Sequence, residues 1–234
     1  MAYNFDTIAR DYDRMNRMMT LELDRLWRKR AVREALGART SSSAEEGGGR
    51  GRPRSQVLDV ACGTGDMVFG LVEQGCTVTG VDISEEMMAI AKQKAPQATY
   101  ILADVEKLPF DDNSFDAVTC AFGVRNFVHL EQGLSEMLRV LKPGGTMVIL
   151  ELATPDSPLI RPLYNIYTRR IIPWLGARIA GSREAYTYLP ASIERFPKGK
   201  EFAAIVKRLG ASAVEKKFTF GVCRLYIINK EAAG

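Results

Sequence analysis

The stretch Val57–Asp82 constrains the fold most strongly, because it places a glycine-rich turn between two short apolar strands. It begins V-L-D-V-A-C-G-T-G-D, continues with a segment of helical composition and ends V-T-G-V-D. A buried strand, a glycine turn that opens a helix, and an acidic residue about 20 residues further on form the layout of a nucleotide-type ligand site. The sequence therefore predicts an α/β fold with a doubly wound, Rossmann-like sheet and a ligand at its switch point.

Two features of the glycine turn separate it from a dinucleotide site. Asp59 lies inside the first strand, and Val68 stands where the dinucleotide pattern has its third glycine. A pyrophosphate binds best at a helix N-terminus that has no carboxylate beside it. A carboxylate suits a cationic ligand instead, so we expect S-adenosylmethionine (SAM), which carries a sulfonium and an ammonium group.

Acidic residues at the ends of three successive strands supply the predicted contacts with SAM. Asp59 and Thr64 are placed to hold the amino-acid end, and Asp82 is placed to accept hydrogen bonds from both ribose hydroxyls. Asp104, beside the backbone N–H of Val105, can read an adenine edge. A glycine-rich turn alone is weak evidence, but the three acids together make the prediction specific. The predicted cofactor-binding residues are Asp59, Gly63, Thr64, Gly65, Asp82, Asp104, Val105 and Ala121.

Composition narrows the class of protein. The chain has 234 residues, of which 46% are hydrophobic and 26% charged, and its net charge is +4, as expected for a globular protein with one sizeable core. The four cysteines are scattered without a C-x-x-C pair, so we expect neither a disulfide nor a bound metal. The N-terminus M-A-Y-N-F-D does not resemble a signal peptide, and no apolar run reaches about 18 residues. These patterns predict a cytoplasmic protein.

Apolar segments of strand length alternate with segments of helical periodicity, which predicts parallel βαβ units. The last strands are expected to add an antiparallel edge to the mostly parallel sheet. The predicted strands are 56–61, 77–82, 99–102, 116–121, 146–151 and 224–229, and the predicted helices are 66–74, 84–95, 131–141 and 198–209.

The composition also predicts how the chain is organised. Residues 1–37 are expected to form a helical cap, and 38–55 a flexible linker, since that segment is almost free of large apolar side chains. Residues 56–155 form the predicted SAM-binding core. Residues 156–197 interrupt the alternation and are expected to form a helical lid over the carboxyl ends of the strands. Residues 198–234 complete the core with a helix and edge strands.

Several segments resemble a known family. The glycine turn resembles motif I of class I SAM-dependent methyltransferases, and L-P-F-D-D-N-S-F-D-A-V and R-V-L-K-P-G-G are also common in that class. Three further segments are similar to signatures of the quinone-biosynthetic C-methyltransferases: Y-D-R-M-N at 12–16 followed by W-R, F-G-V-R-N at 122–126, and Y-T-Y-L-P-A-S-I-E-R-F-P at 186–197. The chain departs from the family's usual Ser, His and Ser at Thr20, Asp24 and Ala153.

The resemblance implies methylation of a ring carbon of demethylmenaquinol or of a ubiquinol precursor. Such a reaction needs in-line placement of the ring, stabilisation of a phenolate and a proton acceptor. Arg125 is the first candidate for phenolate stabilisation, the alternative being a structural salt bridge at the end of the fourth strand. Asn126 could orient the ring oxygen. Tyr12, Asp13 and Tyr188 are candidates for substrate binding and proton relay, although Tyr188 could equally pack in the lid.

The same resemblance implies a prenylated substrate, which resides in a bilayer. The segment 158–180 combines Ile, Leu, Tyr and Trp with four arginines, so it could lie at the inner face of a membrane. An ordinary amphipathic lid helix would have the same composition. The sequence leaves open whether the protein forms a homodimer.

Alternatives remain at this stage. The acceptor could be a naphthoquinol, a benzoquinol or another small aromatic molecule. A protein of another class, a non-catalytic SAM-binding scaffold subunit, would not need Arg125 and Asn126. A nucleic-acid methyltransferase is disfavoured, because the chain lacks an Asn/Asp-Pro-Pro-Tyr motif and a continuous basic run with aromatic residues.

Overall fold

The computed structural model describes residue 6 and residues 9–37, 55–174 and 183–230. Nearly all of the predicted linker 38–55 lies outside the described residues, as does the segment 175–182. The division of the chain into five parts therefore stays a prediction.

A seven-stranded sheet in the order β3-β2-β1-β4-β5-β7-β6 forms the centre of the described structure. Neighbouring strands are parallel from β3 to β5, whereas β7 runs antiparallel to both β5 and β6. The doubly wound fold with an antiparallel edge is therefore confirmed. The strands are β1 (Gln56–Val60), β2 (Thr77–Asp82), β3 (Thr99–Leu102), β4 (Phe115–Ala121), β5 (Leu141–Leu152), β6 (Ser212–Phe218) and β7 (Cys223–Asn229).

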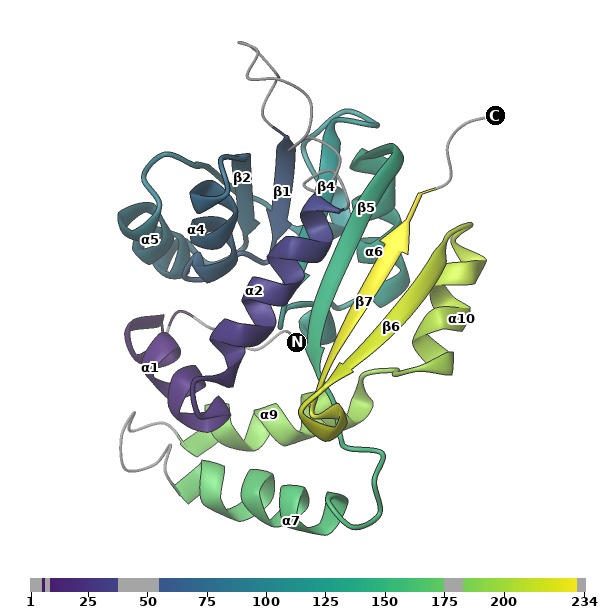
Figure 1. The fold of residues 1–234 in the computed structure, drawn as a ribbon. Helices are drawn as coiled ribbons and strands as arrows, with labels where there is room; N and C mark the ends of the chain where they lie inside the picture. Colours follow the sequence, from purple (N-terminus) through teal and green to yellow (C-terminus); the bar gives the residue numbers. More distant parts are fainter. Residues whose placement is uncertain (1–5, 7–8, 38–54, 175–182, 231–234) are drawn as a thin grey trace, which may run out of the picture.

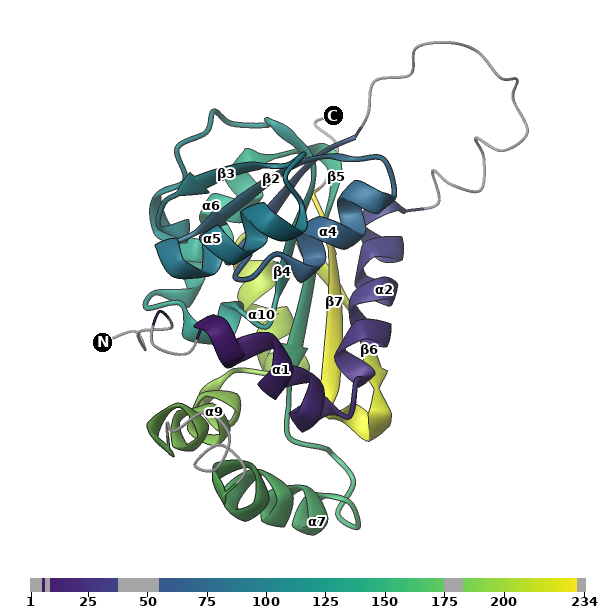
Figure 2. The ribbon, with the colours of Figure 1, turned by 90° about the vertical axis from the view of Figure 1, so that its left-hand side faces the viewer.

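Helices cover both faces of the sheet (Figures 1 and 2). Apolar side chains of α2, α4 and α5 pack on one face, and those of α6 and α10 on the other, so that the sheet separates two buried clusters. The helices are α1 (Ala9–Thr20), α2 (Leu23–Leu36), α4 (Asp66–Glu73), α5 (Glu85–Lys94), α6 (Leu130–Val140), α7 (Arg161–Ile166), α9 (Arg183–Arg195) and α10 (Lys200–Arg208); shorter helical segments are η2 (Val105–Lys107), η3 (Val124–Asn126), η4 (Tyr167–Ile171) and η5 (Thr219–Gly221).

The structure differs most from the predictions at the start of β5 and at β6. The predicted helix 131–141 ends at Val140, and β5 begins directly at Leu141, because the first residues of K-P-G-G already extend the sheet beside β4 through an irregular register. Strand β6 was not predicted. Its S-A-V-E-K-K-F pattern places most side chains in solvent, which is how an edge strand avoids pairing with other chains.

The N-terminal segment forms α1 and α2, which meet at a sharp turn. Leu21 and Glu22 both have positive φ angles, 53° and 63°, a conformation that ends one helix and redirects the chain into the next. Thr20 Oγ1 donates a hydrogen bond of 2.8 Å to Asp24 Oδ1 across this turn. Thr20 and Asp24, which both differ from the usual residues of the family's N-terminal signature, therefore contact each other.

Candidate active site

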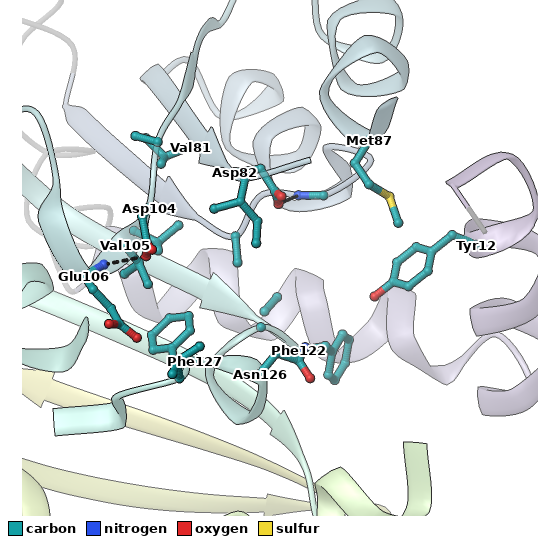
Figure 3. Close-up of a pocket in the computed structure, with 18 residues that line it drawn as sticks. Tyr12, Val81, Asp82, Met87, Asp104, Val105, Glu106, Phe122, Asn126 and Phe127 are labelled. Atoms are coloured by element: carbon teal, nitrogen blue, oxygen red, sulfur yellow. Dashed lines mark hydrogen bonds between the residues drawn. The ribbon is translucent and has the colours of Figure 1, made fainter. Parts of the chain in front are cut away.

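A cavity of about 890 Å³, counting its open mouth, lies at the carboxyl ends of the parallel strands. Its wall is made by the loops after β1, β2, β3 and β4 and by α1 (Figure 3). Predicted site residues that line it are Tyr12, Gly63, Asp82, Asp104, Val105, Ala121 and Asn126.

Asp82 links the two loops on either side of the cavity. Its Oδ2 accepts a hydrogen bond of 2.8 Å from the backbone N–H of Gly63, and its Oδ1 accepts one of 2.9 Å from that of Ser84. Burial raises the pKa of the Asp82 carboxyl, although these N–H donors favour the ionised form. The remaining lone pairs of a carboxylate held this way can accept hydrogen bonds from a diol.

The glycine turn requires glycine for two different reasons. Gly63 lines the cavity and has a φ of 53°. Gly65 has a φ of 82°, and a Cβ atom there would lie 2.8 Å from Cβ of Ala91. Among the described residues, the cavity wall does not include Gly65. Gly65 therefore allows α4 and α5 to pack closely, while Gly63 leaves room for a ligand.

Asp59 directly precedes Val60 and Ala61, which line the cavity, but it is not among the described residues of the cavity wall. Its side chain is 1% exposed and accepts a hydrogen bond of 2.6 Å from Thr119 Oγ1. Burial raises the pKa of Asp59 to about 7, an effect that the Thr119 hydroxyl and the charge of Arg28 only partly oppose. Direct contact between Asp59 and the amino-acid end of SAM stays a prediction.

The buried Asp59 should make the stability of the protein depend on pH. Because the folded-state pKa of about 7 lies above the ordinary value of 3.8, Asp59 contributes stability below the lower value and loses it as the pH rises through the higher one. The Asp59 contribution to the free energy of unfolding should fall by about 1.4 kcal/mol for each pH unit between them. Denaturant unfolding of wild type and Asp59→Asn at pH 5, 6 and 7 measures it; equal slopes in both proteins would contradict the prediction.

Thr64 and Asp13 lie together on the outer side of the glycine turn. Thr64 Oγ1 donates a hydrogen bond of 2.5 Å to Asp13 Oδ1, and Lys94 Nζ lies 2.5 Å from Asp13 Oδ2. Within the described part of the chain, neither Thr64 nor Asp13 belongs to the cavity wall. These contacts link the turn to α1, and the predicted roles of both residues at the ligand are untested.

Asp104 and Val105 lie where the sequence placed the adenine contact. Asp104 follows β3 and caps η2, since its Oδ1 accepts a hydrogen bond of 2.9 Å from the N–H of Glu106. Asp104, Val105 and Glu106 all line the cavity (Figure 3). Glu106 and Ile83 also line the cavity and were not predicted. Ile83 directly follows Asp82, and Glu106 is two positions after Asp104.

Arg125 forms a buried ion pair with Glu151. Its Nη1 lies 2.6 Å from Glu151 Oε1, its backbone N–H donates to Glu151 Oε2 at 3.2 Å, and the two side chains are only 5% and 1% exposed. Nη1 also donates to the carbonyl of Phe122. The wall residues that the structure describes do not include Arg125. The salt bridge considered as the alternative is therefore present, and a direct role at the phenolate stays a prediction.

Asn126, Tyr12 and Tyr188 converge from three helical segments. Asn126 on η3 and Tyr12 on α1 both point into the cavity (Figure 3). Tyr188 on α9 donates a hydrogen bond of 3.1 Å from its hydroxyl to Asn126 Oδ1. Tyr188 therefore holds the amide of Asn126, and through this contact α9 reaches the wall of the cavity.

Several apolar residues of the wall were missed by sequence reasoning. Phe122 is the first residue of the F-G-V-R-N motif and Phe127 directly follows it, so that motif could have identified them. Phe122 has a positive φ of 61°, which is strained for a bulky residue and is typical of functional sites. Met87 of α5 carries no local signal, because its helical spacing is that of any core residue. Together they make parts of the cavity wall apolar and aromatic.

Solved structures with the same fold include SAM-dependent methyltransferases. One from Thermotoga maritima has a TM-score of 0.63 at 17% identity and covers 97% of this chain and 98% of its own. Another, from Aquifex aeolicus, has a TM-score of 0.50 at 19% identity and covers 74% of this chain and 81% of its own. This likeness shows the fold, and the glycine turn and the acidic residues at successive strand ends are the features expected of a SAM site on such a fold.

The chain belongs to the ubiE/COQ5 methyltransferase family, whose sequence profile matches residues 2–230. It is 39% identical to the demethylmenaquinone methyltransferase of Bacteroides fragilis, over 97% of this chain and 90% of the relative. It is 40% identical to the ubiquinone/menaquinone biosynthesis C-methyltransferase UbiE of Geobacter sulfurreducens, over 97% of this chain and 86% of the relative. The family expected from the motifs is confirmed.

No cluster of three or more His, Cys, Asp or Glu side chains in the described ranges is placed to hold a metal ion. Of the helices that the structure describes, none is long and apolar enough to cross a bilayer.

Proposed function

We propose that the protein transfers a methyl group from SAM to a ring carbon of demethylmenaquinol and so forms menaquinol. The observation that supports this most directly is the division of the cavity: Asp82 and Asp104 lie on one side, and Tyr12, Asn126 and Phe122 on the other (Figure 3). The first side suits a ribose and an adenine, the second an aromatic ring with oxygen substituents. Relatives from Bacteroides fragilis and Chlorobaculum tepidum, each 39% identical, are demethylmenaquinone methyltransferases.

Bound SAM supplies a methyl sulfonium that is already electrophilic, so the transfer calls for no metal. The residues have to place the ring carbon in line with it. Asn126, held by Tyr188, would orient a ring oxygen, and the hydroxyl of Tyr12 would contact a second one. The positive charge of Arg125 behind the wall is close enough to interact electrostatically with Tyr12 and Tyr188, and it would favour an ionised ring oxygen in the same place.

The proposal is tested by incubating the purified protein with methyl-labelled SAM and each reduced quinone. We expect label in demethylmenaquinol. Label only in a prenylated methoxybenzoquinol would favour a role in ubiquinone biosynthesis, to which the name of the Geobacter sulfurreducens relative also refers. No transfer to either quinol while SAM still binds would overturn the enzyme assignment and favour a SAM-binding scaffold.

We also propose that α7 and η4 contact the membrane that contains the prenylated substrate. Leu163, Ile166 and Trp174 are 69%, 52% and 54% exposed, and Arg170 is exposed beside them. The opposite side of the same helical segment carries the buried Thr168 and Ile172, which face the protein. Exposed apolar side chains next to a basic group fit the headgroup boundary of an anionic bilayer.

The double variant Leu163→Glu with Ile166→Glu should reduce binding to phosphatidylglycerol vesicles by about ten-fold, because the two side chains can no longer enter an apolar layer. Co-sedimentation measures this, and Val214→Glu on β6, where Val214 is 56% exposed, is the matched control. Methylation of a tailless quinol should not change. If wild type does not bind vesicles but forms dimers that the double variant lacks, this face is an interface between copies.

A further inference from the structure

One basic and two acidic side chains meet where α1, α4 and α5 come together beside the glycine turn. Lys94 Nζ, at the end of α5, lies 2.5 Å from Asp13 Oδ2 of α1 and 2.5 Å from Asp66 Oδ1 of α4. Each side chain is partly exposed. One ammonium group therefore joins carboxylates from two different helices, and we call these three residues the Lys94 node.

The Lys94 node holds two parts of the cavity wall in place. Asp13 directly follows Tyr12, which lines the cavity, and it accepts a hydrogen bond from Thr64, which directly follows the cavity residue Gly63. Moving Asp13 would thus move Tyr12 and release Thr64 together. Among the described residues, no member of the node lines the cavity; the node reaches it through Tyr12, which is next to Asp13, and through Thr64, which is next to Gly63.

A second contact ties the same N-terminal segment to the loop after β2. Ser84 Oγ donates to Asp6 Oδ1, and the N–H of Ser84 donates to Asp82 Oδ1. The segment before α2 is therefore attached both at the ribose end of the cavity, through Ser84, and at the glycine turn, through the Lys94 node.

Helix α1 depends on such contacts, because little of it is buried. Ala9 and Met15 are its buried residues, and an isolated helix of this length is marginal in water. Burial raises the pKa of Asp66, but Arg28, Lys94 and Arg17 outweigh it and lower that pKa overall. Asp66 is thus ionised, and without Lys94 it would face the carboxylate of Asp13 across the gap that the ammonium group now fills.

We propose that Lys94 is a positioning residue that keeps α1 closed over bound SAM. Opening the node would let α1 and Tyr12 move away from the cavity, and the ligand would then leave faster. This inference rests on the SAM site of the proposed function and is independent of the methyl acceptor.

The test compares Lys94→Met with Lys92→Met, which removes an exposed lysine from the last turn of the same helix. Calorimetric titration with SAM at 0.1 M salt should show roughly ten-fold weaker binding for Lys94→Met and none of this loss for Lys92→Met, as expected for a network of this kind. At 1 M salt the difference between Lys94→Met and wild type should shrink, since the partly exposed charges are screened. The KM for SAM should rise with little change in kcat.

Hydrogen exchange supplies an independent measurement. Amides of residues 9–20 should exchange faster in Lys94→Met than in Lys92→Met, and SAM should slow the exchange in both. Asp13→Asn should show the same loss of SAM affinity, and adding it to Lys94→Met should cost little more. Wild-type SAM affinity in Lys94→Met, or equal salt dependence in the variant and wild type, would overturn the proposal. If SAM binding responds as expected but no quinol is methylated, the proposed methyl transfer fails and the role of Lys94 at the SAM site stands.

Discussion

Replacing Asp82 with asparagine is expected to weaken SAM binding by at least about 100-fold. Both carboxylate oxygens already accept backbone hydrogen bonds, from Gly63 and Ser84, at 2.8 and 2.9 Å. Asparagine has one acceptor oxygen, so its NH₂ group must face one of these N–H donors. Each hydrogen bond to a charged group is worth about 1.5–3 kcal/mol. The reoriented amide can no longer accept hydrogen bonds from both ribose hydroxyls, and the loss of two such bonds corresponds to 100-fold or more.

Calorimetric titration with SAM measures the Asp82→Asn effect, and Asp111→Asn, which changes an exposed carboxylate in the loop before β4, is the control. Thermal unfolding should show that both variants are folded at the titration temperature. A loss of less than about five-fold, which is only about 1 kcal/mol, would mean that Asp82 orders the loops without holding the ribose.

The residues near Asp82 were predictable because the information is local. A strand, a turn and a helix each have a short-range pattern, and parallel strands necessarily bring their carboxyl ends to one edge. Gly63, Asp82 and Asp104 therefore lie at one cavity, as expected from three separate stretches of sequence.

The Lys94 node was not predictable in the same way. Lys94 and Asp13 are 81 positions apart, and Thr64 and Asp13 are 51 apart. Nothing in the local sequence around Asp13 distinguishes a carboxylate that faces a ligand from one that pairs with a lysine. The family signature identified the position, and the packing of α1 on α5 decided its contacts.

Arg125 shows a second limit of sequence reasoning. The F-G-V-R-N motif placed it correctly next to the cavity, but its partner Glu151 ends a different strand, 26 positions away. Because both side chains are buried, their pairing follows from the order of β4 and β5 in the sheet. The sequence shows that Arg125 and Glu151 are present, but only the fold shows that they form an ion pair.

Replacing Arg125 with methionine is expected to lower the free energy of unfolding by about 3–5 kcal/mol, because it leaves the buried Glu151 carboxylate without its cation. Denaturant unfolding measures the change. Adding Glu151→Gln to Arg125→Met should recover most of the stability, since glutamine removes the buried charge and its oxygen can still accept the hydrogen bond from Leu152, which is 2.8 Å in the wild type. An effect below about 1 kcal/mol for Arg125→Met alone would show that water reaches Glu151.

The double variant also separates the two roles of Arg125. If the guanidinium stabilises the phenolate, the stable double variant should bind SAM normally and have a kcat about 100-fold or more below that of Glu151→Gln alone, as when a charge-stabilising donor is removed from an active site. If Arg125 only neutralises Glu151, turnover should return together with stability. Measuring kcat of the double variant on demethylmenaquinol at a temperature where it is fully folded therefore distinguishes catalysis from structure, which Arg125→Met alone cannot do.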